Sequence, residues 1–524
     1  RSFMGAASQQ TSLAISPDGT QVLNGMWDSS ATPSFNLWSL ITGKSIRGFH
    51  GHAKQVNSVA FSPDGQRALT ASDDQTLKLW DLNAGAEIKT FSGHTDLVFN
   101  AAFSPDGRLA VSASAQPAPG KVKLWDVASG KEILNLTGKY LDPKPIPIVF
   151  SPDGKHVLTA SRFLQDFEDD THTYVDMKTG ENANSRVVRH SVNLFDVASG
   201  KTINTYYARR SVSGYFFDIK TGHSKKVISL AVSPDGSLAL TGSLAGSVIP
   251  NYQEGNIRLW DINSCEEIRG LAGHVGQVTA VAFSPDGRMA LSGESFQGLK
   301  SELLVKLWDV ASGKEIRSFS GHTDNINAVK FSTDGRMAIS ASSDQTTRVW
   351  DVSSGKEILQ HIHFKNDEWI SIMPNGYFAA SSAKIAENLN VRIGMVVYGI
   401  DQFYDVFYRP DIVEAALAGK ETSSMVTLTL NEALKNPPPV IQKVEASSPG
   451  VASTVKVAFR IKSGGGGIGD VRIFHNGKLV RSDGAAPTMP DALLGMKTNQ
   501  VTSEVLIVQM RAMHQAALKD ASLG

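Results

Sequence analysis

The chain has 524 residues, and its 51 lysine and arginine residues are balanced by 51 aspartate and glutamate residues. This balance argues against a nucleic-acid binder, whose affinity for phosphates needs an excess of positive charge, and against a polybasic membrane anchor. The longest apolar run, 393–400, is far shorter than the roughly 20 residues that span a bilayer, so we expect a soluble chain without membrane insertion.

The chain has a single cysteine, Cys265, and this count excludes several kinds of cysteine site. It excludes an intrachain disulfide, a cysteine-rich zinc site and an iron–sulfur cluster. One cysteine is compatible with both the cytoplasm and the periplasm, and the cytoplasm is the compartment that we favour. The sequence begins at Arg1, so it does not show whether a signal peptide preceded it.

The tetrapeptide Ser-Pro-Asp-Gly recurs along the chain, with one copy changed to Ser-Thr-Asp-Gly. The copies begin at Ser16, Ser62, Ser104, Ser151, Ser233, Ser284 and, in the changed form, Ser332. Proline presets φ, aspartate bonds the nearby backbone and glycine accepts a positive φ, so each copy predicts a tight turn. Apolar stretches flank every copy, which predicts a β-hairpin in each repeat.

A third strand in each repeat ends on Trp-Asp or a variant of it, and a turn and a fourth strand follow. The aromatic positions are Trp38, Trp80, Trp125, Phe195, Trp260, Trp308 and Trp350. Gly-His precedes several repeats, at His52, His94, His223, His274 and His322. Four strands per roughly 42 residues with these marks resemble the WD40 repeat family over about residues 10–365. The resemblance implies an all-β fold, a seven-bladed β-propeller whose blades close into a ring.

The resemblance also implies a hydrogen-bonded chain within each blade, made by the His, an Asp before the third strand, a Ser or Thr, and the Trp. Two repeats hold the complete set: His52, Asp74 and Trp80 in one, and His322, Asp344 and Trp350 in the other. Such a network specifies packing, so we interpret these residues as structural and not catalytic. The other five repeats lack the Asp in its usual place, and the fourth has Phe195 for Trp and Lys139 for His.

Those five repeats carry longer segments between their second and third strands, at 27–34, 115–121, 162–190, 244–255 and 294–303. In a WD40-type propeller these loops emerge on one face, together with the loops between blades. Two inter-blade loops, 139–147 and 206–222, are elaborated as well. Loops on a rigid scaffold often carry binding function, so this face is predicted to bind a protein partner.

Aromatic residues and arginines, which are typical interface anchors, gather in the fourth repeat. The partner-binding candidates are Phe163, Phe167, Asp169, Asp170, Tyr207, Arg209, Arg210, Tyr215 and Phe217, with Tyr252 from the next repeat. The alternative is that these aromatic residues pack on one another and that the acidic and arginine side chains pair with each other. The loops would then fold onto themselves.

The predicted propeller domain spans residues 1–382. Its last part, 369–381, reads as strand–turn–strand around Met-Pro-Asn-Gly, and we favour a hairpin that seals a seven-bladed ring over part of an eighth blade. Residues 383–439 are predicted to be a helical linker. A helix there begins at Pro410 and ends at Gly419, and the linker finishes with Pro437-Pro438-Pro439.

From residue 440 the apolar pattern alternates again, in the stretches 440–446, 455–461, 471–474 and 505–510. Asn476-Gly477 is a hairpin turn signal. We expect residues 440–524 to form a small immunoglobulin-like β-sandwich.

This order of parts resembles bacterial multidomain proteins in which a WD40 propeller and a sandwich precede a caspase-like peptidase domain. The resemblance covers about residues 365–483. Such proteases use a cysteine nucleophile and a histidine base. Neither catalytic residue can be assigned in this chain, because Cys265 occupies an ordinary turn position directly after Trp260-Asp261. We therefore expect no enzyme within this chain, with the peptidase domain, where one exists, beyond Gly524.

No cofactor or metal is expected. His361 and His363 share one strand face but have no clear third ligand, and we interpret them as a blade-edge pair. The acidic run 166–170 lacks the ligand spacing of an EF-hand loop. Motifs for zinc proteases, serine hydrolases and nucleotide binding are not found in the sequence.

Our leading hypothesis is a non-catalytic protein–protein interaction scaffold that binds a partner through the elaborated loop face. Two alternatives stay open: the regulatory or sensor portion of a caspase-like cysteine protease, and a structural subunit of a large assembly.

Overall fold

The computed structural model describes residues 9–27, 35–114, 122–136, 147–165, 174–175, 182–183, 187–207, 210–213, 216–219, 226–244, 257–264, 266–295, 303–364, 368–382, 385, 390–393, 396–399 and 404–426. It also describes the strand backbone at 440–446, 454–462, 471–475, 478–483, 491–499 and 506–510. Everything below refers to these residues.

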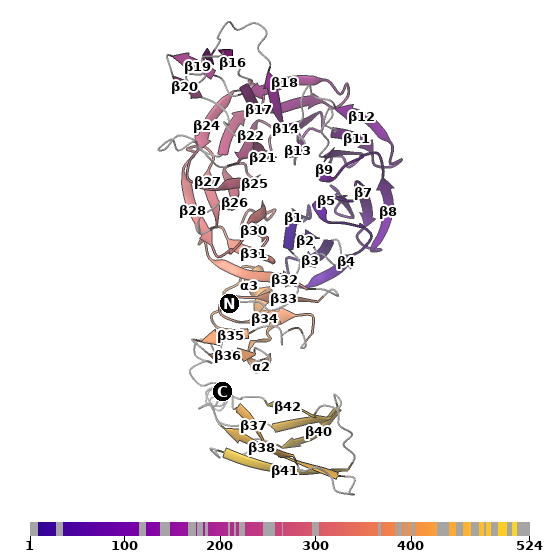
Figure 1. Cartoon of the computed structure of the whole chain (residues 1–524), viewed down its shortest axis with the longest axis vertical. Helices are drawn as coiled ribbons and strands as arrows, with labels where there is room; N and C mark the ends of the chain where they lie inside the picture. Colours follow the sequence, from indigo (N-terminus) through magenta and orange to yellow (C-terminus); the bar gives the residue numbers. More distant parts are fainter. Residues whose placement is uncertain are drawn as a thin grey trace. The chain divides into compact units, whose positions relative to one another are not determined.

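Seven antiparallel blades follow one another around a ring, and each begins with four strands paired in chain order (Figure 1). Blades 1 to 3 comprise β1(Gln9–Ile15), β2(Gln21–Trp27), β3(Phe35–Ser39) and β4(Ser45–Phe49); β5(Val56–Phe61), β6(Arg67–Ser72), β7(Leu77–Asp81) and β8(Ala86–Phe91); and β9(Val98–Phe103), β10(Leu109–Ser114), β11(Val122–Asp126) and β12(Glu132–Leu136). Blade 4 comprises β13(Ile148–Phe150), β14(His156–Gln165), β17(Val187–Asp196) and β18(Thr202–Tyr207).

Blade 5 comprises β21(Val227–Val232), β22(Leu238–Ser243), β23(Ile257–Asp261) and β24(Glu267–Leu271), and blade 6 comprises β25(Gln277–Phe283), β26(Met289–Ser295), β27(Leu304–Asp309) and β28(Glu315–Ser320). Blade 7 comprises β29(Ile326–Phe331), β30(Met337–Ser342), β31(Thr346–Asp351) and β32(Glu357–His363). The predicted seven-bladed propeller is confirmed.

The Ser-Pro-Asp-Gly turns join the first and second strands as the sequence predicts. In blade 2 the Ser62 hydroxyl donates to Asp64 Oδ1 at 2.5 Å and accepts from the Arg67 amide at 2.9 Å. Gly65 has a φ of +70°, which only glycine adopts without strain. These hydrogen bonds all lie within the turn, so the turn geometry is set by the motif itself.

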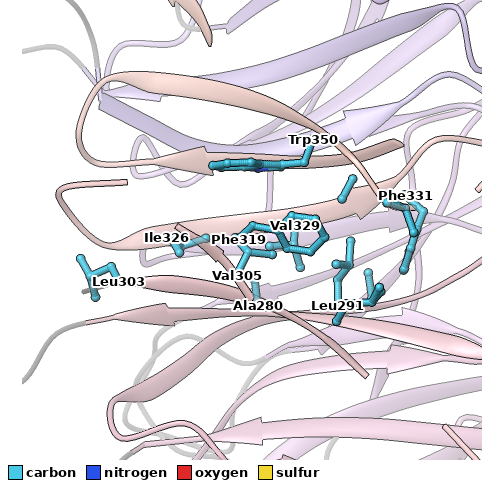
Figure 2. Close-up of a cluster of buried hydrophobic side chains, with 13 residues drawn as sticks. Ala280, Leu291, Leu303, Val305, Phe319, Ile326, Val329, Phe331 and Trp350 are labelled. Carbon is cyan, nitrogen blue, oxygen red and sulfur yellow. The ribbon is translucent and has the colours of Figure 1, made fainter. Parts of the chain in front are cut away.

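The core lies between neighbouring blades. Figure 2 shows the cluster shared by blades 6 and 7, where Val305 and Phe319 meet Val329, Phe331 and Trp350. Trp350 is 1% exposed. Every blade thus buries both of its faces, and removal of one blade would expose the faces of two others.

Blade 7 meets blade 1 directly, and each of the two is built from consecutive strands. Side chains tie this seam together. The Asn24 amide donates to Thr347 Oγ1 at 2.7 Å, and the Asn327 amide donates to the Gln10 carbonyl at 2.6 Å. The ring therefore closes by packing and side-chain hydrogen bonds between its first and last blades.

Two compact units divide the chain, the first ending at Trp369 and the second beginning at Ile370. The expected strand–turn–strand is present as β33(Trp369–Ile372) and β34(Phe378–Ala380), and a second hairpin pairs β35(Asn390–Ile393) with β36(Val396–Gly399). The sealing role of the first hairpin and the domain limits at 382 and 439 stay predictions.

Two short helices follow, α2(Tyr404–Phe407) and α3(Pro410–Leu417). Pro410 opens α3, and Gly419, with a φ of +72°, lies just beyond its end, as predicted. Across the described residues, no helix has both the length and the apolar character needed to cross a membrane.

Six strands lie in the last part of the chain. One sheet has the order β37(Val440–Ala446), β38(Thr454–Lys462), β41(Asp491–Asn499), and the other has the order β40(Lys478–Asp483), β39(Val471–His475), β42(Leu506–Met510). The immunoglobulin-like sandwich stays a prediction. β41 falls in a stretch where the sequence has no clear periodicity and does not predict a strand.

Candidate functional site

The strands that border the loops predicted to bind a partner all meet those loops on one side of the propeller. In a sheet of four consecutive antiparallel strands, the connection from the second strand to the third leaves at the same end as the connection to the next blade. The Ser-Pro-Asp-Gly turns lie at the opposite end. We call the side of the second-to-third connections the loop face.

Blade 4 differs from the other blades at this face. β14 and β17 have ten residues each, whereas the second and third strands of the other blades have five to seven. The additional pairs run from Ser161 opposite Ser191 to Gln165 opposite Val187. The insertion at 162–190 therefore begins as a two-stranded ribbon that continues the blade.

The strand register places two candidate aromatics on the same face of a sheet. Ser191 of β17 lies opposite both Ser161 of β14 and Tyr207 of β18. Because alternate residues of a strand share a face, Phe163 and Tyr207 belong to one face of the blade 4 sheet.

Two further candidates lie in the hairpin between blades 4 and 5, formed by β19(Arg210–Ser213) and β20(Phe216–Ile219). Arg210 pairs with Ile219, and Val212 pairs with Phe217. Arg210 and Phe217 consequently share one face of this hairpin.

The structure does not describe the remaining candidates. These are Phe167, Asp169, Asp170, Arg209, Tyr215 and Tyr252, and Cys265, His223 and Lys139 likewise lie outside the described residues.

The two histidine networks predicted to be complete are formed by direct contacts. In blade 2, His52 lies 2.7 Å from Asp74 Oδ2 through Nδ1 and 2.7 Å from Thr70 Oγ1 through Nε2. The Trp80 indole donates to the same hydroxyl at 2.9 Å. Both imidazole nitrogens are thus engaged inside the protein.

Blade 7 repeats this arrangement. His322 lies 2.8 Å from Asp344 Oδ2 and 2.7 Å from Ser340 Oγ, to which the Trp350 indole donates at 2.9 Å. Burial raises the pKa of Asp344, but the hydrogen bond and charge of His322, with the Thr346 hydroxyl, lower it to about 2.

Blade 6 has a third complete network that the sequence did not reveal. His274 lies 2.7 Å from Glu294 Oε2 and 2.5 Å from Ser292 Oγ, and the Trp308 indole donates to Ser292 at 2.7 Å. Asp74 and Asp344 follow their hydroxyl residue by four positions, whereas Glu294 follows Ser292 by two. The longer glutamate side chain makes up for its earlier place in the chain.

Three other blades keep parts of the network. The indole of Trp125 donates to Ser112 at 2.8 Å, that of Trp260 to Thr241 at 2.8 Å, and that of Trp38 to Asn24 at 3.4 Å. In blade 4 the buried Phe195 has no N–H, and the Thr159 hydroxyl at the equivalent position has no hydrogen-bond partner among the described residues.

His361 and His363 lie in the seam between blades 7 and 1. The His361 ring stacks on Trp38 and lies 6.0 Å from the Trp369 ring, and the Asn36 amide lies 2.9 Å from His363 Nδ1. Within the described residues, no three histidine, cysteine or acidic side chains come close enough together to hold a metal ion. Both histidines take part in packing between blades.

Comparison with known proteins agrees with this geometry. The family model for the WD domain, G-beta repeat, matches residues 43–81, 85–126, 216–261, 265–309 and 313–351. The uncharacterized WD repeat-containing protein sll1491 of Synechocystis sp. is 29% identical over 150 residues, which cover 27% of this chain and 39% of that protein. WD repeat-containing protein 82 of Drosophila melanogaster is 28% identical over 167 residues, which cover 29% of this chain and 46% of that protein. The chain thus spans less than half the length of both relatives.

Proposed function

We propose that the WD40-repeat β-propeller, formed by the described strands from β1 to β32, captures a protein partner on its loop face, chiefly with blade 4. Proteins with WD repeats typically act as protein-interaction scaffolds, and the propeller fold is generally non-catalytic. The function is then recognition, with the rigid ring holding a binding surface in place.

The extension of β14 and β17 carries this proposal. Ordering the backbone of two ten-residue strands costs more conformational entropy than ordering strands of five to seven residues, which suffice in the other blades. Its register puts Phe163 and Tyr207 on one face, and aromatic residues supply large contact areas at a low entropic cost.

The β19–β20 hairpin supports the proposal independently. Arg210 and Phe217 share a face there, and an arginine beside an aromatic ring is a common composition of interface hot spots. This hairpin follows blade 4 directly, so both groups of anchors belong to the same sector of the loop face.

The test compares two double variants of the full chain. Partners retained by the immobilised wild-type protein are identified by mass spectrometry, purified, and titrated against Arg210→Ala/Phe217→Ala. The matched control is Lys131→Ala/Lys314→Ala, in turns at the opposite end of blades 3 and 6. We expect the first variant to bind at least tenfold more weakly, with an unchanged melting temperature, and the control to bind like wild type. Equal binding by both variants would refute the proposal.

A further inference from the structure

The propeller encloses a central channel with a volume of about 790 Å³. The first strand of each blade lines it: β1, β5, β9, β13, β21, β25 and β29. Sites for small molecules typically occupy about 300–1,000 Å³, so the channel is large enough for one.

One position in these strands departs from the pattern of the ring. Two residues before the Ser of each turn motif, six blades have a small apolar side chain: Ala14, Ala60, Ala102, Val149, Ala231 and Ala282. Blade 7 has Lys330 there. Among the channel-lining residues that the structure describes, it is the only one with a charged side chain.

The neighbours of Lys330 fix its direction. Val329 and Phe331 are buried in the cluster with Trp350 (Figure 2). Because successive side chains of a strand point to opposite sides, Lys330 points away from that cluster, and it is exposed where it lines the channel.

No carboxylate within 4 Å compensates this ammonium group among the described residues. Asp334, four residues further on, is already engaged: it accepts from Ser332 Oγ at 2.5 Å and from the Arg336 amide at 3.0 Å, and Arg336 Nε lies 3.7 Å away. Although Lys330 is exposed to the channel, the channel walls around it partly desolvate the ammonium group and lower its pKa. A partly desolvated cation without a partner gains free energy when an anion binds beside it.

The turn of blade 7 changes at a second channel position. Six blades have a proline that lines the channel mouth: Pro17, Pro63, Pro105, Pro152, Pro234 and Pro285. Blade 7 has Thr333, an exposed residue whose hydroxyl can donate a hydrogen bond. The one blade that adds a cation therefore also adds a donor, three residues along the same segment.

We propose that Lys330 makes the central channel a binding site for a small molecule that carries an oxyanion, either a carboxylate or a phosphate. The ammonium group pairs with the anion, and the alanine and valine side chains around it contact the apolar part of the ligand. This site is separate from the loop face, because it depends on the first strands and their turns.

The test uses the full chain and two simple probes, inorganic phosphate and acetate, titrated at constant ionic strength with chloride as the background anion. Isothermal calorimetry and the melting temperature are both recorded, since a ligand that binds only the folded state raises the melting temperature. Binding of phosphate alone identifies a phosphate site, and binding of acetate alone identifies a carboxylate site.

Lys330→Ala is the decisive variant, because alanine occupies the same position in five other blades and is compatible with the fold. We expect it to weaken probe binding at least tenfold, Lys330→Arg to retain binding, and Lys314→Ala, an exposed lysine at a turn, to match wild type. The proposal is overturned when the wild-type protein binds neither probe more tightly than chloride, or when Lys330→Ala binds within twofold of wild type.

Discussion

The indole ring of Trp38 stacks on the imidazole ring of His361, with centroids 4.5 Å apart and planes 9° apart. Trp38 belongs to the third strand of blade 1 and His361 to the fourth strand of blade 7. In blade 2 the corresponding indole, Trp80, instead meets His52 from the preceding connection and Phe49 from the preceding blade. A histidine on the fourth strand of blade 7 thus stacks against the tryptophan of blade 1 at the point where the ring closes.

The first prediction concerns this closure. Thr347→Val keeps the shape of the side chain but leaves the Asn24 amide without the hydroxyl that now accepts its hydrogen bond. We expect a loss of about 1–3 kcal/mol in the free energy of unfolding, measured by urea denaturation. Hydrogen exchange should rise in β1 and β29. An increase of the same size in β5 and β9, the first strands of blades 2 and 3, which do not border the seam, would show that the seam has no special role.

The second prediction is a loss of stability in mild acid. Burial, with the charge of His363, lowers the pKa of His361 to about 3, and burial, with the charge of His50, lowers the pKa of His363 to about 4. Histidines in the unfolded chain titrate near 6.5, so the unfolded state binds protons first as the pH falls. Stability should be constant above about pH 6.5 and should fall below it, by about 1.4 kcal/mol per pH unit for each imidazole, until the folded pKa is reached.

His361→Phe tests this assignment, because phenylalanine keeps an aromatic ring against Trp38 and cannot titrate. Urea denaturation at pH values from 7 to 4 should give a shallower loss of stability than in the wild-type protein. Lys314→Ala, a substitution of an exposed residue in a turn of blade 6, serves as the control and should keep the wild-type slope. A wild-type slope in His361→Phe would assign the acid sensitivity to other groups.

The ring could be predicted from the sequence because its determinants are local and repeated. Each turn motif bonds to itself within five residues, as Ser62, Asp64 and Arg67 do, and six of the seven third strands end with tryptophan followed by aspartate or serine. The role of a residue that departs from the repeated pattern could not be predicted in this way. Glu294 replaces an aspartate expected two positions later, so only the fold reveals that its longer side chain reaches His274.

The seam is a non-local feature, which explains why the sequence missed it. Asn36 and His363 are 327 residues apart and belong to no shared motif, so only ring closure brings them within 2.9 Å. The binding candidates show the same limit: the lengths of the loops pointed to the loop face, but the shared face of Phe163 and Tyr207 depends on the register of three strands.

The third prediction concerns the network of blade 6. Glu294→Ala removes the acceptor for His274 Nδ1 and for the Gly276 amide, which donates to Glu294 Oε1 at 2.8 Å. Leaving two buried donors unpaired should cost about 2–4 kcal/mol of stability, measured by chemical denaturation. Glu294→Asp should recover only part of this loss, because the shorter side chain begins two positions too early. Full stability in Glu294→Asp would contradict the argument from side-chain length.

The last prediction compares one substitution in two blades. Thr70→Val in blade 2 removes the hydroxyl that lies 2.7 Å from His52 and accepts the hydrogen bond of Trp80. In blade 4 the equivalent Thr159 is buried, and the aromatic residue beside it is Phe195, which has no N–H to donate. Thr70→Val should therefore lower the free energy of unfolding by about 2–3 kcal/mol, whereas Thr159→Val should leave it unchanged or raise it by about 1 kcal/mol.

The comparison is matched, because both substitutions exchange the same groups on the second strand of a blade at a fully buried position. Differences in hydrophobic burial and side-chain entropy nearly cancel between them, and the number of hydrogen bonds lost is what remains. Thr159→Val combined with Phe195→Trp gives a further check. This double variant has the indole N–H but lacks the hydroxyl that would accept its hydrogen bond, so it should be less stable than Phe195→Trp alone. Equal losses in Thr70→Val and Thr159→Val would mean that burial of the hydroxyl, and not its bonding to His52 and Trp80, sets the energetics of this position.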